Sequence, residues 1–287
     1  MDAAINLKLN IEKLDTLPAM PAIAQKLLTL ALDTDEGEAK LLELVQQDPL
    51  IAAKIIGLAN SPMFGSSRKV HSVSDASMLL GLTRVKSVAI AIATMSAVTK
   101  LPEGLLKSGD LWLHSMAIAL AMRAIASAMP ARTRPVEDQI FLAGLLHDIG
   151  YMALSYLDVG ASNALHTRLR ANPEGSVLQI EQELIGMTHG DIGARLGLHW
   201  GLPEEIIAVM RYHHTPDDEE AAIGQPLVSL VNLAGRLLTS VGVTEAAEDE
   251  IGEEEWQELG IGQDKAQDIA AQIPTIAEQA RLMADGV

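Results

Sequence analysis

Histidines and one neighbouring aspartate are the residues of this chain best suited to do chemistry. Seven of the eight histidines fall between residues 114 and 214, and His147 stands directly beside Asp148. Apolar residues flank this pair on both sides, so the charged Asp148 is expected to be ion-paired, bound to a metal or placed at a pocket edge. Imidazole and carboxylate together suit a divalent transition metal such as iron or manganese. A lone His-Asp dipeptide is nevertheless a weak signal.

Further histidines strengthen that signal, because each is placed where a helix could aim it into one central groove. His114 lies in the middle of an apolar helix, His189 opens a helix after Thr188, and His213 and His214 close another. The candidate metal-ligand set is therefore His114, His147, Asp148, His189, His213 and His214.

A purely structural interpretation fits the same spacing. His189 would be a polar residue in the first turn of a helix, His213 and His214 would bond helix C-terminal carbonyls, and His114 would be a core histidine bonded to Asp148. The spacing does not choose between these interpretations. The other three histidines are predicted to have surface or loop roles: His71, His166 and His199.

Composition narrows the chemistry and the partners. The chain has no cysteine, which excludes disulfides, thiolate zinc sites and cysteine nucleophiles. The formal net charge of −17 argues against nucleic-acid binding, which depends on neutralising phosphates. The most acidic run, residues 245–255, is interpreted as a solvated surface.

The N-terminus lacks a signal-peptide pattern, and the longest uncharged stretch, Ser87 to Thr99, is too short to span a bilayer. A soluble, cytoplasmic protein without membrane contact is expected.

The secondary-structure elements that must position these residues are all predicted to be helices. Apolar residues make up 48% of the chain and aromatic residues only 3%, so the core must be aliphatic. Helical spacing predicts an all-α fold, and no segment alternates as a half-buried strand would. Asp48 is expected to cap the start of a helix, Asn60 its end, and Thr83 the start of a long apolar helix. The predicted helices cover residues 21–31, 39–47, 49–59, 74–81, 83–99, 108–129, 137–156, 176–185, 188–199, 203–214 and 225–240.

A boundary is expected at residues 101–104. It would separate an N-terminal helical lobe, residues 12–104, from a second lobe, residues 105–240, that holds the histidine set. Residues 241–287 are expected to add an acidic loop and two further helices.

The order of the motifs resembles one known family, the HDOD (HD-related output) domain, over residues 12–240. The resemblance rests on Leu17-Pro-Ala-Met-Pro21, Gln47-Asp-Pro49, Leu58-Ala-Asn-Ser-Pro62, Leu80-Gly81, Leu145-Leu-His-Asp-Ile-Gly150, Trp200-Gly-Leu-Pro203 and Tyr212-His-His214. It implies a two-lobed helical bundle whose C-terminal lobe derives from HD-superfamily metal phosphohydrolases. It also implies a regulatory or scaffolding role in bacterial signalling.

The resemblance assigns roles to the histidine set and also exposes two departures. His114 matches the first histidine of the HD pattern, and His147-Asp148 matches the signature pair. His189, His213 and His214 resemble the added ligands of relatives that hydrolyse cyclic di-GMP. Active relatives commonly carry a lysine where this chain has Tyr151, and their final aspartate falls here on Asn232 or Gly235, depending on register. Neither residue supplies the carboxylate that a metal-assisted hydrolase needs.

Three functions remain open after these observations. The leading hypothesis is a non-catalytic signalling module that binds a protein partner, requires no cofactor and could form a homo-oligomer. Its ligand or partner cleft is expected near Asn60 and Ser61. The alternative is a divergent metal-dependent phosphohydrolase or cyclic-dinucleotide phosphodiesterase. A third hypothesis is a metal-sensing or structural site in which a bound ion holds helices together.

Overall fold

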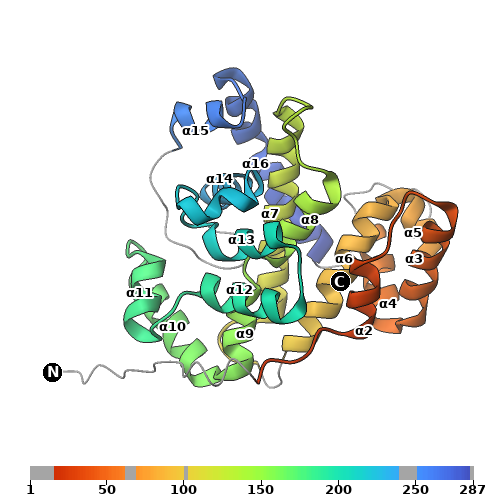
Figure 1. Cartoon of the computed structure of the whole chain (residues 1–287), viewed down its shortest axis with the longest axis horizontal. Helices are drawn as coiled ribbons and strands as arrows, with labels where there is room; N and C mark the ends of the chain where they lie inside the picture. The colour runs from red at the N-terminus through yellow and green to blue at the C-terminus, as the bar shows by residue number, and fades with distance from the viewer. Residues whose placement is uncertain (1–15, 62–68, 100–102, 239–250, 285–287) are drawn as a thin grey trace.

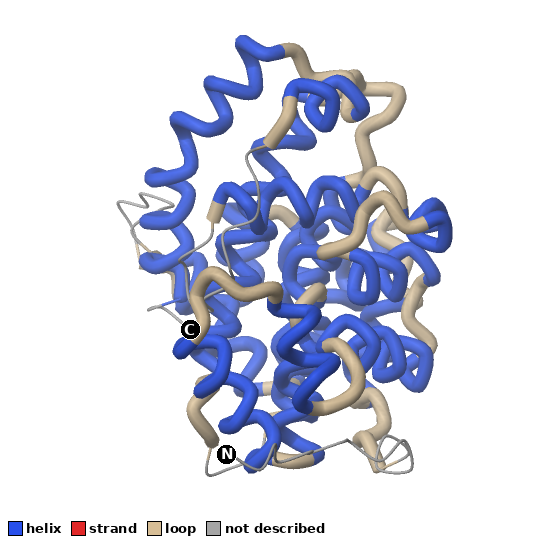
Figure 2. The backbone as a smooth tube through the Cα atoms, turned by 90° about the vertical axis from the view of Figure 1, so that its left-hand side faces the viewer, coloured by secondary structure: helices blue, strands red, loops and turns tan. Residues whose placement is uncertain are grey.

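The computed structural model describes residues 16–61, 69–99, 103–238 and 251–284. Several sequence-based expectations lie outside these residues: the start of the first lobe at 12–15, residues 101–102 of the boundary at 101–104, and residues 245–250 of the acidic run. Of the described residues 74% are helical, and no strand occurs among them (Figure 2). The predicted all-α class is confirmed.

The first helices of the chain pack around α6, which is buried over most of its length. α6 contacts α2, α4, α5 and α8, and its buried face is built from Val, Ile and Ala side chains. Asp48 caps α4 as predicted, because its carboxylate accepts bonds from the backbone N–H groups of Leu50 and Ile51. The bounds in this region are α2 Ala22–Leu28, α3 Asp35–Gln47, α4 Pro49–Ala59, α5 Val73–Leu80 and α6 Leu82–Val98.

A second central helix, α7, organises the rest of the fold. α7 packs against α8, α14 and α16, and in Figure 1 it stands between α2–α6 on the right and α10–α12 on the left. The bounds here are α7 Ser108–Ala128, α8 Glu137–Leu146, α9 Ile149–Leu157, α10 Val159–Ala171, α11 Val177–Leu184, α12 His189–Trp200, α13 Glu204–Tyr212, the 3-10 helix η2 Glu219–Gly224, α14 Leu227–Leu237, α15 Glu253–Glu258 and α16 Gln263–Ala284.

The single helix predicted over 137–156 is wrong in one important detail. The chain breaks at His147 and Asp148, where Asp148 leaves helical geometry with φ −100° and ψ 10°, and α9 starts at Ile149. Adjacent residues of a regular helix point in different directions. The break lets the two side chains approach each other, with His147 Nε2 3.3 Å from an oxygen of Asp148.

Two further expectations are corrected. Helix α10 lies in a segment where no helix was predicted, because Val159, Gly160 and Asn163 near its start are weak helix formers. Its N-cap, Asp158, compensates by accepting a bond from the backbone N–H of Ala161. Thr83 does not cap α6. Gly81 takes that position with φ 84°, a left-handed conformation that favours glycine.

In the part of the chain that the structure describes, two apolar helical stretches are long enough to cross a membrane by length and composition, namely α7 and the broken run 137–157 formed by α8 and α9. Their most apolar windows are 72% and 83% buried inside the protein. The bent pair α5 and α6 passes the same test only when joined across a 115° bend. Apolar helices buried to this extent, in a chain of net charge −17, indicate a soluble protein.

Candidate metal centre

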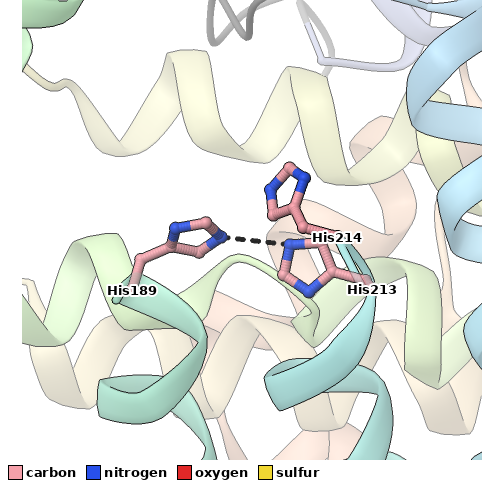
Figure 3. A group of neighbouring side chains, drawn as sticks. All are labelled: His189, His213 and His214. Carbon is pink, nitrogen blue, oxygen red and sulfur yellow. Dashed lines mark hydrogen bonds between the residues drawn. The ribbon is translucent and has the colours of Figure 1, made fainter. Parts of the chain in front are cut away.

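The six predicted ligands meet in space, although they come from four separate parts of the fold. His114 projects from the middle of α7, His147 and Asp148 form the break between α8 and α9, His189 starts α12, and His213 and His214 follow α13. Their ligand atoms form two groups, His114 with His147 and Asp148, and His189 with His213 and His214, each group within 4.8 Å. We call these six residues the histidine–aspartate cluster. Figure 3 shows the second group, in which a ring nitrogen of His189 points at one of His213 and the ring of His214 lies beside them.

Capping interactions and one close backbone approach hold this arrangement. Thr188 and Asp191 form a capping box that starts α12 with His189 as its first residue. Gly150 allows α9 to approach that point, because a Cβ atom there would lie 1.9 Å from the carbonyl oxygen of His189. The glycine of the His-Asp-Ile-Gly motif is therefore required by packing.

The Asp148 carboxylate is the centre of the cluster. It is fully buried, and four imidazole Nε2 atoms surround it. His114 and His147 lie 3.4 Å and 3.3 Å from Oδ2. His189 and His213 each lie 3.4 Å from Oδ1. Within the ranges that the structure describes, neither oxygen accepts a hydrogen bond of standard geometry.

The surroundings decide which ring nitrogen carries the proton in three of these histidines. Nδ1 of His147 lies 2.9 Å from the carbonyl oxygen of Gly144, and Nδ1 of His213 lies 3.0 Å from that of Val209. Nδ1 of His189 lies 2.8 Å from a carboxylate oxygen of Glu181. Carbonyls and carboxylates only accept, so each Nδ1 donates and each ring turns its Nε2 towards the cluster. The Nε2 atoms of His189 and His213 lie 3.0 Å apart and share one proton when no cation is bound.

This donor set fits a metal cation. Lone pairs that face a buried carboxylate repel it unless a proton or a cation lies between them. Two ligands that each lie about 2.1 Å from one metal are separated by about 3.0–3.4 Å, which matches the distances around Asp148. Imidazole and carboxylate are suitable ligands for iron, manganese or zinc. A bound divalent metal would supply positive charge at the point where these groups converge.

The ionisation of the cluster without a metal leads to the same conclusion. Burial alone would raise the pKa of Asp148, but the imidazoles of His147, His189 and His213 outweigh it and hold that pKa well below its ordinary value. Burial would lower the pKa of His189, but Glu181 and Asp148 raise it to about 9. Burial, together with the neighbouring His214, lowers the pKa of His213 to about 3. The two buried carboxylates, Asp148 and Glu181, thus favour positive charge at His189, whereas His213 stays neutral, as a metal ligand must.

Sequence analysis missed Glu181, which orients His189. This carboxylate is fully buried. Its oxygens accept from Nδ1 of His189 at 2.8 Å and from the backbone N–H of His189 at 3.0 Å. A carboxylate behind a ligating histidine fixes its tautomer and increases its basicity. The signal was present, because Val177, Ile180 and Glu181 follow helical spacing and Glu181 therefore occupies the buried face of α11.

Tyr151, at the position of the lysine of active relatives, covers one side of the cluster. Its ring stacks on His189 with centroids 4.2 Å apart and planes 16° apart. Its other neighbour is His166, at 5.4 Å between ring centroids. The prediction that His166 has a surface or loop role is wrong, since only 7% of it is exposed. His71 and His199 are exposed as predicted.

The two positions considered for a last carboxylate serve structural purposes. The amide of Asn232 donates from Nδ2 to the carbonyl oxygen of His213 at 2.9 Å. Its Oδ1 lies 3.4 Å from Arg236, which also pairs with Glu255. Gly235 lies in the last turn of α14. Asn232 therefore supports the backbone beside the cluster, and neither residue adds an anionic ligand.

The expected cleft residues lie at the end of α4. Asn60 is the C-cap of this helix, as predicted. Its side chain also accepts from the backbone N–H of Val70 at 2.9 Å and donates to the carbonyl oxygen of the same residue at 2.8 Å. Asn60 thus joins the end of α4 to the backbone of Val70, while Ser61 is buried.

Comparison with solved structures shows the same fold in several bacterial proteins. A candidate signal transduction protein of Marinobacter aquaeolei VT8 is 26% identical, with a TM-score of 0.82 over 99% of this chain and 62% of that chain. An HDOD domain protein of unknown function from Geobacter sulfurreducens is 24% identical, with a TM-score of 0.76 over 94% and 93% of the two chains. A candidate phosphohydrolase of Shewanella amazonensis SB2B is 22% identical, with a TM-score of 0.72 over 96% and 97%.

Sequence comparison identifies the family. An uncharacterized protein of Treponema pallidum (strain Nichols) is 22% identical over 224 residues, which are 78% of this chain and 42% of that protein. The chain thus spans less than two thirds of the length of both this relative and the Marinobacter protein. The sequence profile of the HDOD domain matches residues 17–216. The motif order, the helical fold and this match together place the chain in the HDOD family.

Proposed function

We propose that this protein is a regulatory module of bacterial signal transduction that binds a protein partner in the cytoplasm and does not hydrolyse phosphodiesters. Its histidine–aspartate cluster holds a divalent transition metal, iron or manganese, as a structural centre. Membership of the HDOD family and likeness to a candidate signal transduction protein support the regulatory role.

The main support for a non-catalytic role is that the cluster is almost inaccessible from solvent. Five of its six residues are at most 3% exposed, and only His214 is partly accessible. A phosphodiester bound for hydrolysis needs room for its phosphate, a positioned water and a positive partner. Here the fully buried Tyr151 stacks on His189 instead, and no lysine stands in that position.

The structural role follows from where the ligands originate. A metal bound by the cluster joins α7, the α8–α9 break, α12 and the end of α13. Binding of a ligand to the folded state alone adds stability that grows with the logarithm of the free ligand concentration divided by Kd. We therefore expect the metal to stabilise the fold and to keep the surfaces used by the partner in one arrangement.

Metal content and turnover measured on the same samples test this proposal. Wild type and Asp148→Asn are compared, with the exposed Asp217→Asn as a control of equal charge change. We expect near-stoichiometric metal by elemental analysis in wild type and Asp217→Asn, and less than a tenth of that in Asp148→Asn. No sample loaded with manganese or iron should hydrolyse cyclic di-GMP or mononucleotides. Turnover in wild type that is lost in Asp148→Asn contradicts the non-catalytic role.

The partner is tested separately. Residues near Asn60 and Ser61 are proposed as its docking surface. A partner captured by the wild-type protein should bind the purified protein with micromolar or better affinity and lose at least tenfold on Asn60→Ala, while Asp217→Asn leaves binding unchanged. If neither the wild-type protein nor the Asn60→Ala variant captures a specific protein, that result argues against a scaffolding role. Size-exclusion chromatography with light scattering decides whether a homo-oligomer forms.

A divergent metal-dependent phosphohydrolase is the second candidate, and one specific observation favours it. Four of the HD-type histidines surround Asp148, His214 lies beside two of them, and Glu181 orients one of them. Such a site could still act if Tyr151 and His214 moved to admit a substrate. The turnover assay above separates this candidate from the regulatory role.

A further inference from the structure

Two sequence motifs that the metal centre does not use meet in the structure. The indole Nε1 of Trp200 donates to the carbonyl oxygen of Pro18 at 2.8 Å, across 182 residues of sequence. Trp200 is the last residue of α12, and Pro18 belongs to the motif Leu17-Pro-Ala-Met-Pro21, which leads into α2 (Figure 1). We call residues 17–21 the proline strap.

The proline strap has the conformation and the side-chain pattern of a polyproline II segment. Residues 18–21 form neither helix nor turn, and Pro21 has φ −55° and ψ 137°, close to the values of that conformation. The conformation repeats every three residues, which places Leu17 and Met20 on one side. Both are 5% exposed, whereas Ala19 between them is exposed. The strap therefore buries one apolar face.

This arrangement matches a common mode of peptide recognition. Aromatic side chains bind proline-containing segments, and proline lowers the entropy lost on binding because it fixes φ in advance. An indole N–H can only donate, and the strap offers it the carbonyl oxygen of Pro18. Contacts other than those of the strap hold Trp200 in place, because α12 packs against both α9 and α13.

The strap itself is attached by few interactions. Among the described residues it makes no backbone–backbone hydrogen bond before Pro21, whose carbonyl accepts from Gln25 at the start of α2. Its tertiary attachment rests on the bond from Trp200 and on the burial of Leu17 and Met20. Segments held by so few contacts open locally at a lower cost than global unfolding.

We propose that the surface around Trp200 is a docking site for an extended, proline-containing segment of the protein partner, and that the proline strap occupies this site in the isolated chain. The inference rests on the proposed role in partner binding. It names the segment that the partner presents, which carries two apolar side chains three residues apart with a proline between them. The strap competes at an effective concentration of about millimolar, so a segment of better fit, or one on a partner bound elsewhere on the protein, replaces it.

Release of the strap is measured on the wild-type chain. The protein has three tryptophans, and replacement by phenylalanine assigns the indole N–H of Trp200 in nuclear magnetic resonance spectra. We expect this N–H to exchange with solvent roughly 100-fold faster than the slowest amides of α12, because the strap opens without unfolding of the helix. Exchange as slow as that of those amides would show that the strap leaves only when the protein unfolds, and would overturn the proposal.

A blocked peptide with the sequence of residues 16–21 is the probe for docking. The double substitution Leu17→Asp and Met20→Asp in the full chain, called the open variant, places charges where the strap buries apolar side chains and so empties the site. We expect the peptide to bind the open variant with a Kd of roughly 0.1–1 mM and to shift the indole signal of Trp200. Wild type should bind it at least tenfold more weakly, because its strap competes. A peptide in which aspartate replaces Met20 should also bind at least tenfold more weakly.

Further variants locate the bound peptide. Trp200→Phe in the open variant keeps an aromatic ring but removes the donor, and it should weaken peptide binding at least fivefold. Trp256→Phe makes the same change at another buried tryptophan and should leave binding unchanged. Thermal unfolding shows whether each variant is folded. An open variant that does not fold would show that the strap is an integral part of the fold, and this result also overturns the proposal.

Failure of this inference is distinguishable from failure of the proposed function. No saturable peptide binding to the folded open variant below 10 mM (roughly ten times the weakest affinity expected), or equal binding after Trp200→Phe, overturns the docking site. A captured partner that binds Trp200→Phe as well as wild type overturns the inference alone. Peptide binding without any captured protein supports the docking site and counts against the regulatory function. Wild-type dimers that dissociate on Trp200→Phe would assign the surface to the strap of a second copy and overturn its assignment to another protein.

Discussion

At the scale of single residues, the proton positions around Asp148 determine what the cluster can bind. Val209, Gly144 and Glu181 provide only acceptors to the Nδ1 atoms of His213, His147 and His189. The Nε2 atoms are therefore committed to the interior of the cluster before any metal arrives. Glu181 differs from the two carbonyls because it adds a full negative charge behind a prospective ligand.

Replacement of Glu181 by glutamine tests that contribution. Glu181→Gln keeps the size of the side chain but removes the charge, and loss of such a supporting carboxylate typically weakens metal binding about 10–100-fold. Competition with a chelator of known affinity measures the change for manganese or zinc. Glu183→Gln, an exposed change on the same helix, is the control and should bind as wild type does. Equal affinities in both variants would show that Glu181 is only a packing residue.

His166 should make the stability of the protein depend on pH in mildly acidic solution. Burial, with the nearby charge of Arg170, lowers its pKa from 6.5 to about 4. Between these values the unfolded chain binds a proton that the native state does not, so the free energy of unfolding falls as the pH falls. The full effect is about 3 kcal/mol.

Urea unfolding of metal-free protein between pH 7.5 and 4.5 measures this effect. His166→Leu should have a flatter pH dependence than wild type, by about 2–3 kcal/mol over that range. The exposed His199→Leu should follow wild type. Identical slopes for wild type and His166→Leu would mean that His166 is protonated in the native state.

The sequence predicted the six residues of the candidate site but not the buried polar residues that surround and orient them. The family pattern and the isolated polar residues in apolar helices pointed to His147 and Asp148. Glu181 and His166 were overlooked because neither belongs to a recognised motif. Both nevertheless stand where helical spacing requires an apolar residue, for example His166 beside Leu165 and Leu169 on the buried face of α10. A search for polar residues on the predicted buried face of each helix would have found both Glu181 and His166.

At the scale of the elements, the closest contact in the site is that between α9 and α12. A Cβ on Gly150 would lie 1.9 Å from the carbonyl oxygen of His189 and 2.9 Å from the backbone nitrogen of Gly193. Backbone atoms cannot give way as a flexible side chain can. The two helices must separate to admit even one methyl group.

Gly150→Ala is therefore expected to destabilise the protein by about 2–4 kcal/mol, as overpacking with a backbone shift does. Displacement of His189 should also reduce bound metal at least tenfold. Urea unfolding and elemental analysis give the two readouts. Gly109→Ala, at a helical position with no atom within 4 Å of the new Cβ, should be neutral or slightly stabilising. A fully metallated and stable Gly150→Ala would contradict the packing argument.

Helix positions were predictable where caps and apolar spacing agreed, as at Asp48 for α4 and Thr188 for α12. The break between α8 and α9 was not, because neither proline nor glycine marks it and the apolar pattern continues from Leu146 to Ile149. Tertiary contacts of Asp148 with three imidazoles, those of His114, His189 and His213, fix that break. Local sequence patterns do not contain such contacts.

At the scale of the whole molecule, residues beyond the HDOD match are part of one packed structure. The match ends at residue 216, yet α16 packs along α7, the helix that carries His114. Ile269, Ile276 and Met283 of α16 are at most 6% exposed. Glu255 of α15 pairs with Arg236 of α14. These contacts make the C-terminal helices a support for α7.

A chain truncated after residue 240 tests that support. Full burial of one large apolar side chain contributes about 1.5–3 kcal/mol, so loss of three from α16 should lower the free energy of unfolding by about 5 kcal/mol, with the newly exposed face of α7 adding to this. We expect a lower urea midpoint, increased binding of a hydrophobic dye and weaker metal retention. Glu255→Gln in the full chain separates the ion pair from the packing and should cost at most about 1 kcal/mol. A truncated chain as stable as the full protein would show that residues 17–240 fold as an independent domain and that α16 only rests on it.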